Sequence, residues 1–529
     1  METKTVDDKT SVALVESLGE EAGKAPGQEP RIIGTVRLVD GDDILLVPAP
    51  TRDPQDPLNL PNWRKWLMLI IVALYGMTGN LLASGIGVLV PQLQEYYHGD
   101  SRVNDLVTYP ALFMGIGNLI AVPFADAIGR RPVYLLSNVV LIVGGIWCSY
   151  STSLGSHIGG RDFMALAAGQ SEALCVMIAE ETFFLHQRGS RIAWFCSLQT
   201  LGTALFIIAS SYLTESLGWR WWYGIFTIIS AATFVLSILF VAETKYDRPL
   251  NSYFGFDPQG NTVRESEFRT RSLDYDTYPH RSFWRDLRPW GHVTTKWQQV
   301  PKFWLSLAQL SLFPGVLYFI ILSGVLLGTY IVMTAVFAQV LIAPPYSFDP
   351  HNLGFVMGGQ AVVAFVVQPL AGYLSDFVLT YWAKRNDGVT EPESRLIPAI
   401  IPLAVGIISC VLYGQACQFP EDWAWPAVVV PLNALFYSFV SIVVLSFVYT
   451  MDCYPQRGHV AMVALCAGRG FISFGISFGT TAFIHELGYD GALNVCAIVI
   501  GVLFGLGIVL YFTGKYIRRF TQKWATDED

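Results

Sequence analysis

The sequence predicts an all-α membrane protein with twelve transmembrane helices, arranged as two related six-helix halves. Three observations lead to this fold class. The chain of 529 residues is unusually apolar, its apolar runs are long enough to cross a bilayer, and a short polar loop occurs once in each half. The two loops read Asp126-Ala-Ile-Gly129-Arg130-Arg131-Pro132 and Gly372-Tyr-Leu-Ser-Asp376, with Lys384 and Arg385 after the second.

The composition requires lipid as the solvent for most of the chain. The mean hydropathy is +0.42, and only 14% of the residues are charged, whereas about a quarter are charged in a soluble domain. The formal net charge of −8 says little about partners, because the distribution of charge matters more than its sum. We therefore expect the lipid bilayer, and no nucleic acid, among the partners.

Twelve apolar runs are each long enough to cross a hydrocarbon core of about 30 Å, which takes roughly 20 helical residues. The first six lie near residues 66–90, 107–125, 132–152, 162–183, 192–214 and 221–242. The second six lie near residues 314–341, 353–375, 397–417, 426–450, 460–484 and 491–513. An even number of crossings places both termini on the same side of the membrane.

Lys and Arg are divided unevenly between alternate loops. Cations precede the first span at Arg64 and Lys65, and others follow the second, fourth, eighth, tenth and twelfth spans. The intervening loops are nearly free of cations, since 91–106 carries Arg102 alone and 343–352, 418–425 and 485–490 carry none. Positively charged residues stay on the cytoplasmic side. Both termini and the central linker are therefore predicted to be cytoplasmic.

Polar segments divide the chain into five parts. Residues 1–61 have the composition of a disordered cytoplasmic tail and lack the apolar core of a signal peptide. The other parts are an N-terminal bundle at 62–242, a cytoplasmic linker at 243–303, a C-terminal bundle at 304–515 and a cytoplasmic tail at 516–529. Short helices on the inner leaflet are expected at Trp284, Trp290, Trp297 and Trp304.

The two loops resemble the signature loops of the major facilitator superfamily, between spans two and three and between spans eight and nine. Further stretches resemble a fungal branch classed with the drug:proton antiporters. They are Asp56-Pro57-x-Asn59-x-Pro61-x-Trp63-Arg64-Lys65-Trp66, Phe184-Leu-His186-Gln-Arg188-Gly189, Gly218-Trp219-Arg220-Trp221, Glu243-Thr244-Lys-Tyr246-Asp-Arg248-Pro249, Glu391-Pro392-Glu393-Ser-Arg395-Leu396 and Tyr449-Thr-Met-Asp452-Cys-Tyr454-Pro455. The resemblance implies a secondary transporter whose two halves rock around a central site.

The sequence departs from the family pattern at several places. Val122 stands where the first signature usually begins with Gly, and Ala165 and Ala167 replace expected glycines in span four. Antiporters of this superfamily usually carry a Gly-Pro and a later Gly in span five, where this chain has Phe206, Ile207 and Ser211. The resemblance implies proton-coupled efflux of drugs or secondary metabolites, but these departures leave uptake of an organic cation or nutrient as an alternative.

The signature residues are predicted to act in gating. Asp126 can accept hydrogen bonds from a helix N-terminus or pair with a cation, and Arg130 and Arg131 can pair with acids at neighbouring helix ends. Contacts of this kind form in one state and break in the other. The predicted gating set is Asp126, Gly129, Arg130, Arg131, Gly372 and Asp376. The alternative is that these cations only set the topology.

Two ionisable residues near the middle of spans are the sharpest candidates for coupling or substrate contact. Glu172 lies in span four and Arg469 lies in span eleven. A charge at bilayer depth costs roughly 2.5–3.5 kcal/mol on insertion scales, so each side chain should face the bundle interior. Burial suits Glu172 to carry a proton. Arg469 keeps its charge and needs an acceptor, which can be Glu172, a backbone carbonyl or a substrate. A purely structural pair is the alternative.

Other polar groups at membrane depth are candidates to line a central cavity. Each is also open to a simpler role, because hydrogen bonds between helices are the commoner use of a single polar side chain in a membrane. Arg161, nearer the outer end of span four, is a candidate to sense the proton site. The remaining candidates are Asn80, Tyr330, Gln360, Asn433 and Tyr437.

The sequence contains no pattern typical of catalysis. There is no nucleophile elbow, metal-ligand cluster or phosphate-binding loop, and the eight cysteines form no CxxC. We therefore predict no enzymatic activity, no metal and no cofactor. We expect a monomer in the plasma membrane that moves a small-molecule substrate together with, or against, protons. A sensor that keeps the transporter fold without turnover is the alternative of a different class.

Overall fold

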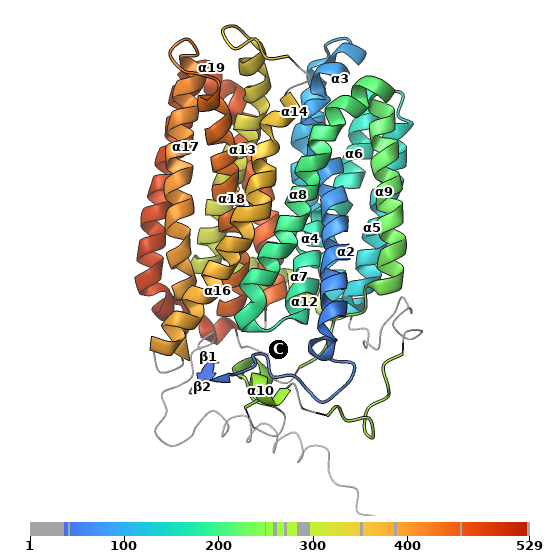
Figure 1. Ribbon diagram of the computed structural model, residues 1–529, viewed down its shortest axis with the longest axis vertical. Helices are drawn as coiled ribbons and strands as arrows, with labels where there is room; N and C mark the ends of the chain where they lie inside the picture. The colour runs from blue at the N-terminus through green and yellow to red at the C-terminus, as the bar shows by residue number, and fades with distance from the viewer. Residues whose placement is uncertain are drawn as a thin grey trace, which may run out of the picture.

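The computed structural model describes residues 36–40, 43–248, 250–257, 262–268, 272–282, 297–349, 353–385, 389–454 and 457–525. Two helical bundles stand side by side, the N-terminal bundle on the right of Figure 1 and the C-terminal bundle on the left. We call the lower end of this view, which carries strand β1 (Val36–Arg37), strand β2 (Val39–Asp40) and helix α10 (Glu265–Phe268), the linker face. The upper end is the opposite face.

Six spans make up the N-terminal bundle. They are α2 (Asn62–Ser84) with the 3-10 turn η2 (Gly85–Val88), α4 (Asp105–Ile128), α5 (Arg130–Ser149), the broken span of α6 (Leu154–Ala168), η4 (Gly169–Ser171) and α7 (Leu174–Thr182), then α8 (Leu185–Leu217) and α9 (Trp219–Phe240). The short helix α3 (Val90–Tyr96) and the turn η3 (Ser101–Asn104) join α2 to α4 at the opposite face.

The C-terminal bundle also has six spans. They are α13 (Pro314–Ile342), the interrupted span of α14 (Leu353–Val356), α15 (Gly358–Val362), the π turn η7 (Val363–Val367) and α16 (Gln368–Arg385), then η8 (Pro392–Ala399) with α17 (Ile400–Gln418), α18 (Pro426–Cys453) and α19 (Gly458–Ala525). Helix α19 holds spans eleven and twelve. The chain reverses between them near Gly488, whose φ of +70° is not helical.

The described residues contain twelve helices that are long and apolar enough to cross a membrane. This confirms the predicted fold class of twelve transmembrane helices in two halves. Several helices run past the apolar stretches at the linker face. Span eight continues to Arg385 and span twelve to Thr521. At the end of span twelve, Lys515 pairs with Glu391 and Arg518 pairs with Glu393.

Two predicted segment boundaries fall inside helices of the structure. The linker does not end at residue 303, since helix α12 (Gln299–Ser311) spans that boundary and exposes Trp304 and Leu305 while it buries Phe303 and Leu307. Trp297 is exposed just before α12, and Trp284 and Trp290 lie outside the described residues. The predicted tail at 516–529 is helical up to Ala525, because the guanidinium of Arg518 pairs with Glu393 at 2.7 Å.

The predicted disorder of residues 1–61 does not hold for the described part of that segment. Residues 43–61 lie on the linker face with most of their side chains buried, and η1 (Pro57–Asn59) is capped by Asp56. Strand β2 pairs with β3 (Asp43–Ile44), and β1 pairs with β4 (Val389–Thr390) of the C-terminal bundle. Composition predicted disorder because this stretch has no apolar run of its own, but it folds by packing on the bundles.

Candidate functional site

The structure brings Glu172 and Arg469 together as an ion pair that joins the two bundles. Glu172 lies where span four is broken, directly after η4 and before α7. Arg469 comes from span eleven, and its guanidinium donates to the Glu172 carboxylate. The Arg469 side chain is only 2% exposed, whereas that of Glu172 is 25% exposed. The carboxylate is therefore the more exposed member of the pair.

The surroundings of Arg469 suit a permanent charge. The rings of Phe439 and Phe447 each lie 5.8 Å from its guanidinium carbon, and such faces attract a cation. Among the described residues, its Nε has no hydrogen-bond partner. Because Arg cannot lose its proton in a protein, Glu172 is what balances this charge. Breaking a buried pair from one side leaves an uncompensated charge, which costs about 3–5 kcal/mol.

Asn80 lies beside the break in span four. Its carbonyl oxygen accepts a hydrogen bond of 3.2 Å from the hydroxyl of Ser171, the residue before Glu172. Span one is thus linked to the turn that presents the carboxylate. The sequence makes Asn80 a candidate to line a central cavity or to join two helices, and its hydrogen bond with Ser171 is of the second kind.

Tyr330 and Gln360 meet in the C-terminal bundle. The Gln360 amide donates to the Tyr330 hydroxyl at 2.5 Å, and the Tyr330 ring is nearly parallel to Phe439 with centroids 6.5 Å apart. The Phe439 ring also faces the Arg469 guanidinium. Gln360, Tyr330 and Phe439 therefore form a chain of side-chain contacts that ends at the ion pair. The π turn η7 begins three residues after Gln360, and turns of this kind occur often at functional sites.

Asn433, Tyr437 and Arg161 have contacts other than the ion pair. The Asn433 amide donates to the carbonyls of Val356 and Val429, which joins helices. Tyr437 lines a separate cavity of about 200 Å³ between α16, α17 and α18. Arg161 is fully buried near the opposite face. Its guanidinium donates to the Tyr223 hydroxyl and to the carbonyls of Leu82, Ala83 and Leu106.

The first signature loop forms a charged cluster at the linker face. Arg130 pairs with Asp126 at 3.1 Å and with Glu181 at 2.8 Å. The Glu243 carboxylate accepts the backbone N–H groups of Arg130 and Arg131 at the start of α5, where a negative charge is favoured. Gly129 has a φ of +113°, a conformation that L side chains rarely adopt, so the turn requires glycine.

The second signature loop reaches from the C-terminal bundle to the N-terminal bundle. The Asp376 carboxylate accepts the backbone N–H groups of Gly189 and Ser190 at 3.1 and 2.7 Å. Gly372 lies against α8, and a side chain there would overlap the methyl group of Ala193. The two bundles are therefore in direct contact at the linker face. The predicted Asp376 and Gly372 both belong to this contact.

Arg395 and Arg188 complete this contact, which we call the interbundle lock: Arg188, Asp376, Arg395 and Asp452. Arg395 bonds to Asp376 at 3.1 Å and to Asp452 at 2.7 Å. Arg188 of α8 lies 3.2 Å from Asp452. All four side chains are at most 11% exposed. A charge network of this kind, once desolvated, is stable only while all its members stay together.

The two signature aspartates occupy equivalent places in the repeat. Asp376 contacts the second turn of α8, which is the fifth span of the N-terminal bundle. Asp126 lies 3.7 Å from His459 in the first turn of α19, which begins the fifth span of the C-terminal bundle. Each bundle thus sets its signature carboxylate against the same part of the other bundle, as expected for a duplicated unit.

Sequence reasoning left Arg188, Arg395 and Asp452 out of the candidate set. A signal was present, because each lies in one of the stretches that resemble the fungal branch, at a predicted cytoplasmic helix end. Their partners come from distant segments, with 264 residues between Arg188 and Asp452. The spacing of residues along the chain does not predict ion pairs between such distant segments. Among the described residues, no group of three or more His, Cys, Asp or Glu could hold a metal ion.

Comparisons with known proteins agree with this architecture. The pattern of the Major Facilitator Superfamily matches residues 67–468. An uncharacterized MFS-type transporter of Schizosaccharomyces pombe is 25% identical, with 92% of this chain and 89% of the relative aligned. Protein HOL1 of Saccharomyces cerevisiae is 24% identical, with 91% of each chain aligned, and MFS-type transporter penM of Penicillium rubens is 27% identical over 81% of this chain and 80% of its own.

Among solved structures, the proton:xylose symporter XylE has the same fold. It superposes with a TM-score of 0.58 at 13% sequence identity, covering 87% of this chain and 97% of XylE. The family pattern spans both bundles and includes both signature loops and span eleven up to Gly468. The chain described here is a multi-pass membrane transporter that belongs to the Major Facilitator Superfamily.

Proposed function

We propose that this transporter is proton-coupled, moves small organic solutes, and uses Glu172 and Arg469 as its coupling site. The observation that carries this proposal is the ion pair between the two bundles at a broken span. Alternating access requires the bundles to move about a midplane site. When they do, each member of this pair needs a new partner, because an unpaired charge is costly at this depth.

A proton is the natural new partner for Glu172. Protonation removes the charge of the carboxylate, so Glu172 can leave Arg469 without exposing an anion to a medium of low dielectric constant. Arg469 stays charged and keeps the faces of Phe439 and Phe447. The protonation state of Glu172 would then decide whether the two bundles are tied together at the midplane.

The exposure of the pair supports exchange of a cationic solute for a proton. Glu172 is 25% exposed and Arg469 is 2% exposed, so a solute meets the carboxylate first. A cationic group and a proton compete for this one carboxylate, and competition makes their transport an exchange. An inward proton gradient then drives the solute out. This supports efflux of drugs or secondary metabolites that carry a cationic group.

Uptake is the second candidate, and two observations favour it. When Glu172 is protonated, Arg469 needs an acceptor, and an acidic solute would supply one while the total charge of the site stays at zero. Proton and solute would then move in the same direction. Helix α8 is also continuous from Leu185 to Leu217, with Phe206 and Ile207 where antiporters of this superfamily usually carry the Gly-Pro that we expected to mark export.

Flux in proteoliposomes with an imposed pH gradient tests the function. The probes are ethidium as a cation and benzoate as an acid, each with the gradient in either orientation. Movement of ethidium against the proton flow supports exchange, and movement of benzoate with the proton flow supports uptake. If a wider set of cationic, acidic and neutral solutes shows no gradient-dependent movement with folded protein, a sensor without turnover replaces the transporter proposal.

A further inference from the structure

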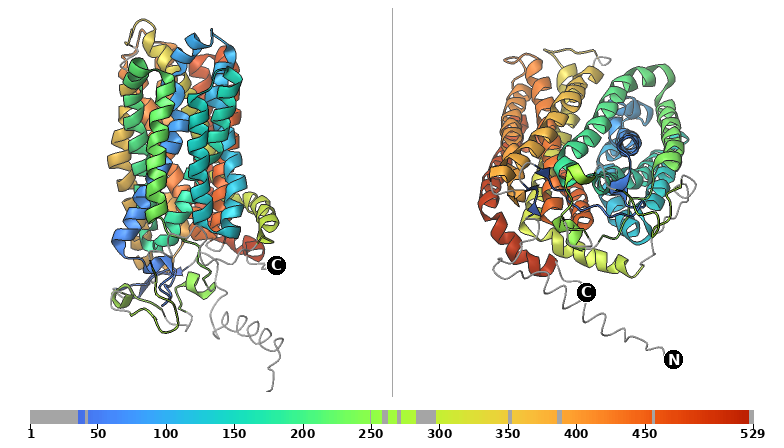
Figure 2. Two further views of the ribbon diagram at one scale, coloured as in Figure 1. Left: turned by 90° about the vertical axis from the view of Figure 1, so that its right-hand side faces the viewer. Right: turned by 60° about the horizontal axis from the view of Figure 1, so that its bottom comes forward.

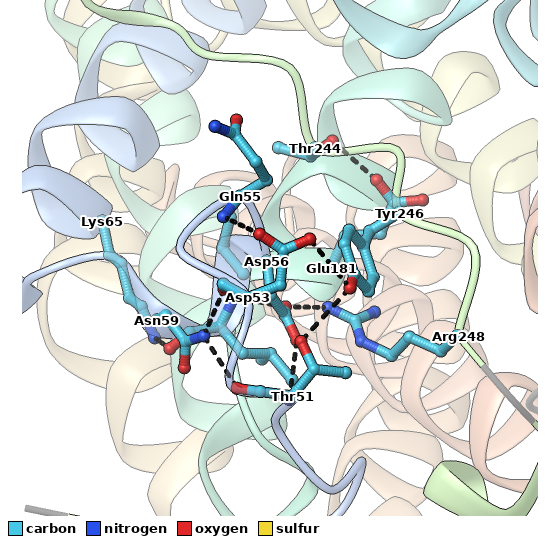
Figure 3. Close-up of polar contacts among 12 residues, drawn as sticks. Thr51, Asp53, Gln55, Asp56, Asn59, Lys65, Glu181, Thr244, Tyr246 and Arg248 are labelled. Carbon is cyan, nitrogen blue, oxygen red and sulfur yellow. Dashed lines mark hydrogen bonds and ion pairs between the residues drawn. The ribbon is translucent and has the colours of Figure 1, made fainter. Parts of the chain in front are cut away.

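An N-terminal strap, which we define as residues 36–40 and 43–61, crosses the linker face. Its last part is fixed to the N-terminal bundle and to the segment after α9 (Figure 3). The Asp56 carboxylate pairs with Arg248 at 2.8 Å, and the Asp53 carboxylate accepts from the Tyr246 hydroxyl at 3.2 Å. The Lys65 ammonium donates to the Leu58 carbonyl at 2.9 Å. These contacts attach the strap to the bundle in which its own helix α2 begins.

The contacts that attach this part of the strap are well protected from water. Asp56 is fully buried, and the neighbouring carboxylate raises the pKa of Arg248 although burial alone would lower it. Burial raises the pKa of Tyr246 to about 12, so its hydroxyl remains a donor near neutral pH. A small apolar cluster below these groups contains Leu46, Ala49, Leu58, Phe184 and Val263.

The first part of the strap reaches across to the C-terminal bundle. Strand β1 pairs antiparallel with β4, so that Val36 is opposite Thr390 and Arg37 is opposite Val389. A second apolar cluster joins three elements: Leu38 and Val47 of the strap, Leu185 of α8, and Leu379 and Ala383 of α16. The backbone N–H of Leu185 also donates to the Val47 carbonyl at 2.7 Å. The strap thus holds the ends of α8 and α16 in one cluster.

The strap covers the interbundle lock. A small cavity of about 20 Å³ beneath Val47 and Pro48 is lined by Arg188 and Asp452 of the lock and by Met451. Figure 1 shows β1 and β2 beneath the C-terminal bundle, and Figure 2 shows the linker face turned forward, with the chain after these strands leading to α2 of the N-terminal bundle. Opening of this face must separate α8 from α16. That separation would pull Leu38 and Val47 out of the apolar cluster and would break the pairing of β1 with β4.

From this geometry we propose that the N-terminal strap is a built-in brake that holds the linker face closed. It adds a releasable contact to the lock, made by residues outside the membrane spans, and it sets how often this face opens. The proposal rests on alternating access by the transporter. It does not depend on which solute or ion is moved, and its test uses no solute.

A cysteine reporter under the strap measures opening of the linker face. Met451→Cys is buried in the closed state, and its reaction with a maleimide reports opening in purified full-length protein in nanodiscs. Labelling is read peptide by peptide by mass spectrometry, because the chain has eight free cysteines, seven of them buried. Every variant below carries this reporter.

The first variant fastens the strap. Val36→Cys with Thr390→Cys places two thiols on directly opposed residues of an antiparallel pair, whose Cα separation of about 4.5–5.5 Å is compatible with a disulfide. Oxidation should slow labelling of the reporter at least tenfold, and reduction followed by removal of the reductant should restore it. The two single-cysteine variants should not respond to oxidation. Equal labelling of the oxidised and reduced double variant would overturn the proposal.

The second variant releases the strap. Leu38→Asp places a charge in the cluster that joins the strap to α16 and should raise reporter labelling at least fivefold. Arg52→Asp is the matched control, since Arg52 is an exposed strap residue, and it should leave labelling unchanged. If Leu38→Asp labels at the unmodified rate, the strap is a passive cover and not a brake. If neither ethidium nor benzoate showed gradient-driven flux in proteoliposomes, the proposed function would be in question, but the effect of the strap variants on reporter labelling would still stand.

Discussion

At the residue scale, the ion pair of Glu172 and Arg469 is the coupling site that we propose. Glu172 and Arg469 lie in different bundles, and each is explained by the other, because neither charge is tolerated alone at this depth. Glu172 is the more exposed member, and the guanidinium of Arg469 lies 5.8 Å from the rings of Phe439 and Phe447. Under the proposed function, the acid takes the proton or the solute and the base keeps its charge.

Glu172→Gln removes the titratable group and keeps the shape of the side chain. We expect gradient-driven flux to fall at least tenfold and its pH dependence to disappear, while the protein still inserts and elutes as a single species. Glu95→Gln is the control, since Glu95 is exposed near the opposite face. Flux in proteoliposomes over a range of pH provides the measurement. An unaltered pH profile in Glu172→Gln would remove this residue from the coupling mechanism.

Gly129→Ala tests the turn that begins the first signature loop. The φ of +113° excludes a side chain, and a Cβ would also meet the Glu243 carboxylate. Backbone strain of this kind costs about 1–3 kcal/mol, so the apparent melting temperature should fall. Gly87→Ala is the control, because nothing lies within 4 Å of a Cβ at that position. Equal melting temperatures for both variants would show that the turn tolerates alanine.

At the scale of elements, the candidate functional residues lie near the starts of helices and at breaks within spans. The second turn of α8 supplies backbone donors to Asp376, and the first turn of α5 donates to the Glu243 carboxylate. At α5 the donors belong to the unpaired N–H groups that begin every helix. Span four is broken where it presents Glu172, and span eight contains a π turn beside Gln360. Interrupted helices of this kind mark the binding sites of many transporters.

Asp376→Asn tests the contact between α8 and α16. The change removes a negative charge from two backbone donors and from Arg395, and breaking such a buried pair costs about 3–5 kcal/mol. We expect the linker face to open more often. Spin labels at the exposed positions Trp63 and Lys384 would show a longer and broader distance distribution, while Asp422→Asn, exposed at the opposite face, would leave it unchanged. An identical distribution would show that this carboxylate does not hold the bundles.

At the scale of the whole molecule, the two bundles form one unit that is closed at the linker face. The lock, the contact of Asp126 with His459 and the strap all act at that end. The structure therefore represents a state in which the two bundles are in contact at the linker face. Because Lys and Arg are concentrated at the same end, this face is expected to be cytoplasmic.

Labelling of engineered cysteines tests this orientation. Ser266→Cys lies in α10 on the linker face, and Thr152→Cys lies between α5 and α6 at the opposite face, and both positions are exposed. A membrane-impermeant maleimide should label Thr152→Cys in intact cells and Ser266→Cys only after permeabilisation. The reverse pattern would place the linker and both ends of the transmembrane domain outside the cytoplasm and would overturn the assignment.

The sequence by itself determined the twelve spans, the duplication and the two charged residues at membrane depth. Hydropathy and the cost of a buried charge are local properties, so residues such as Glu172 and Arg469 stand out without coordinates. Only the tertiary structure decided that these two residues pair, that Arg161 is bonded to Tyr223 instead, and that Arg188, Arg395 and Asp452 form a lock with Asp376. It also decided that residues 43–61 are folded. These features depend on contacts between distant segments, which form only in the folded molecule and which no run of neighbouring residues reports.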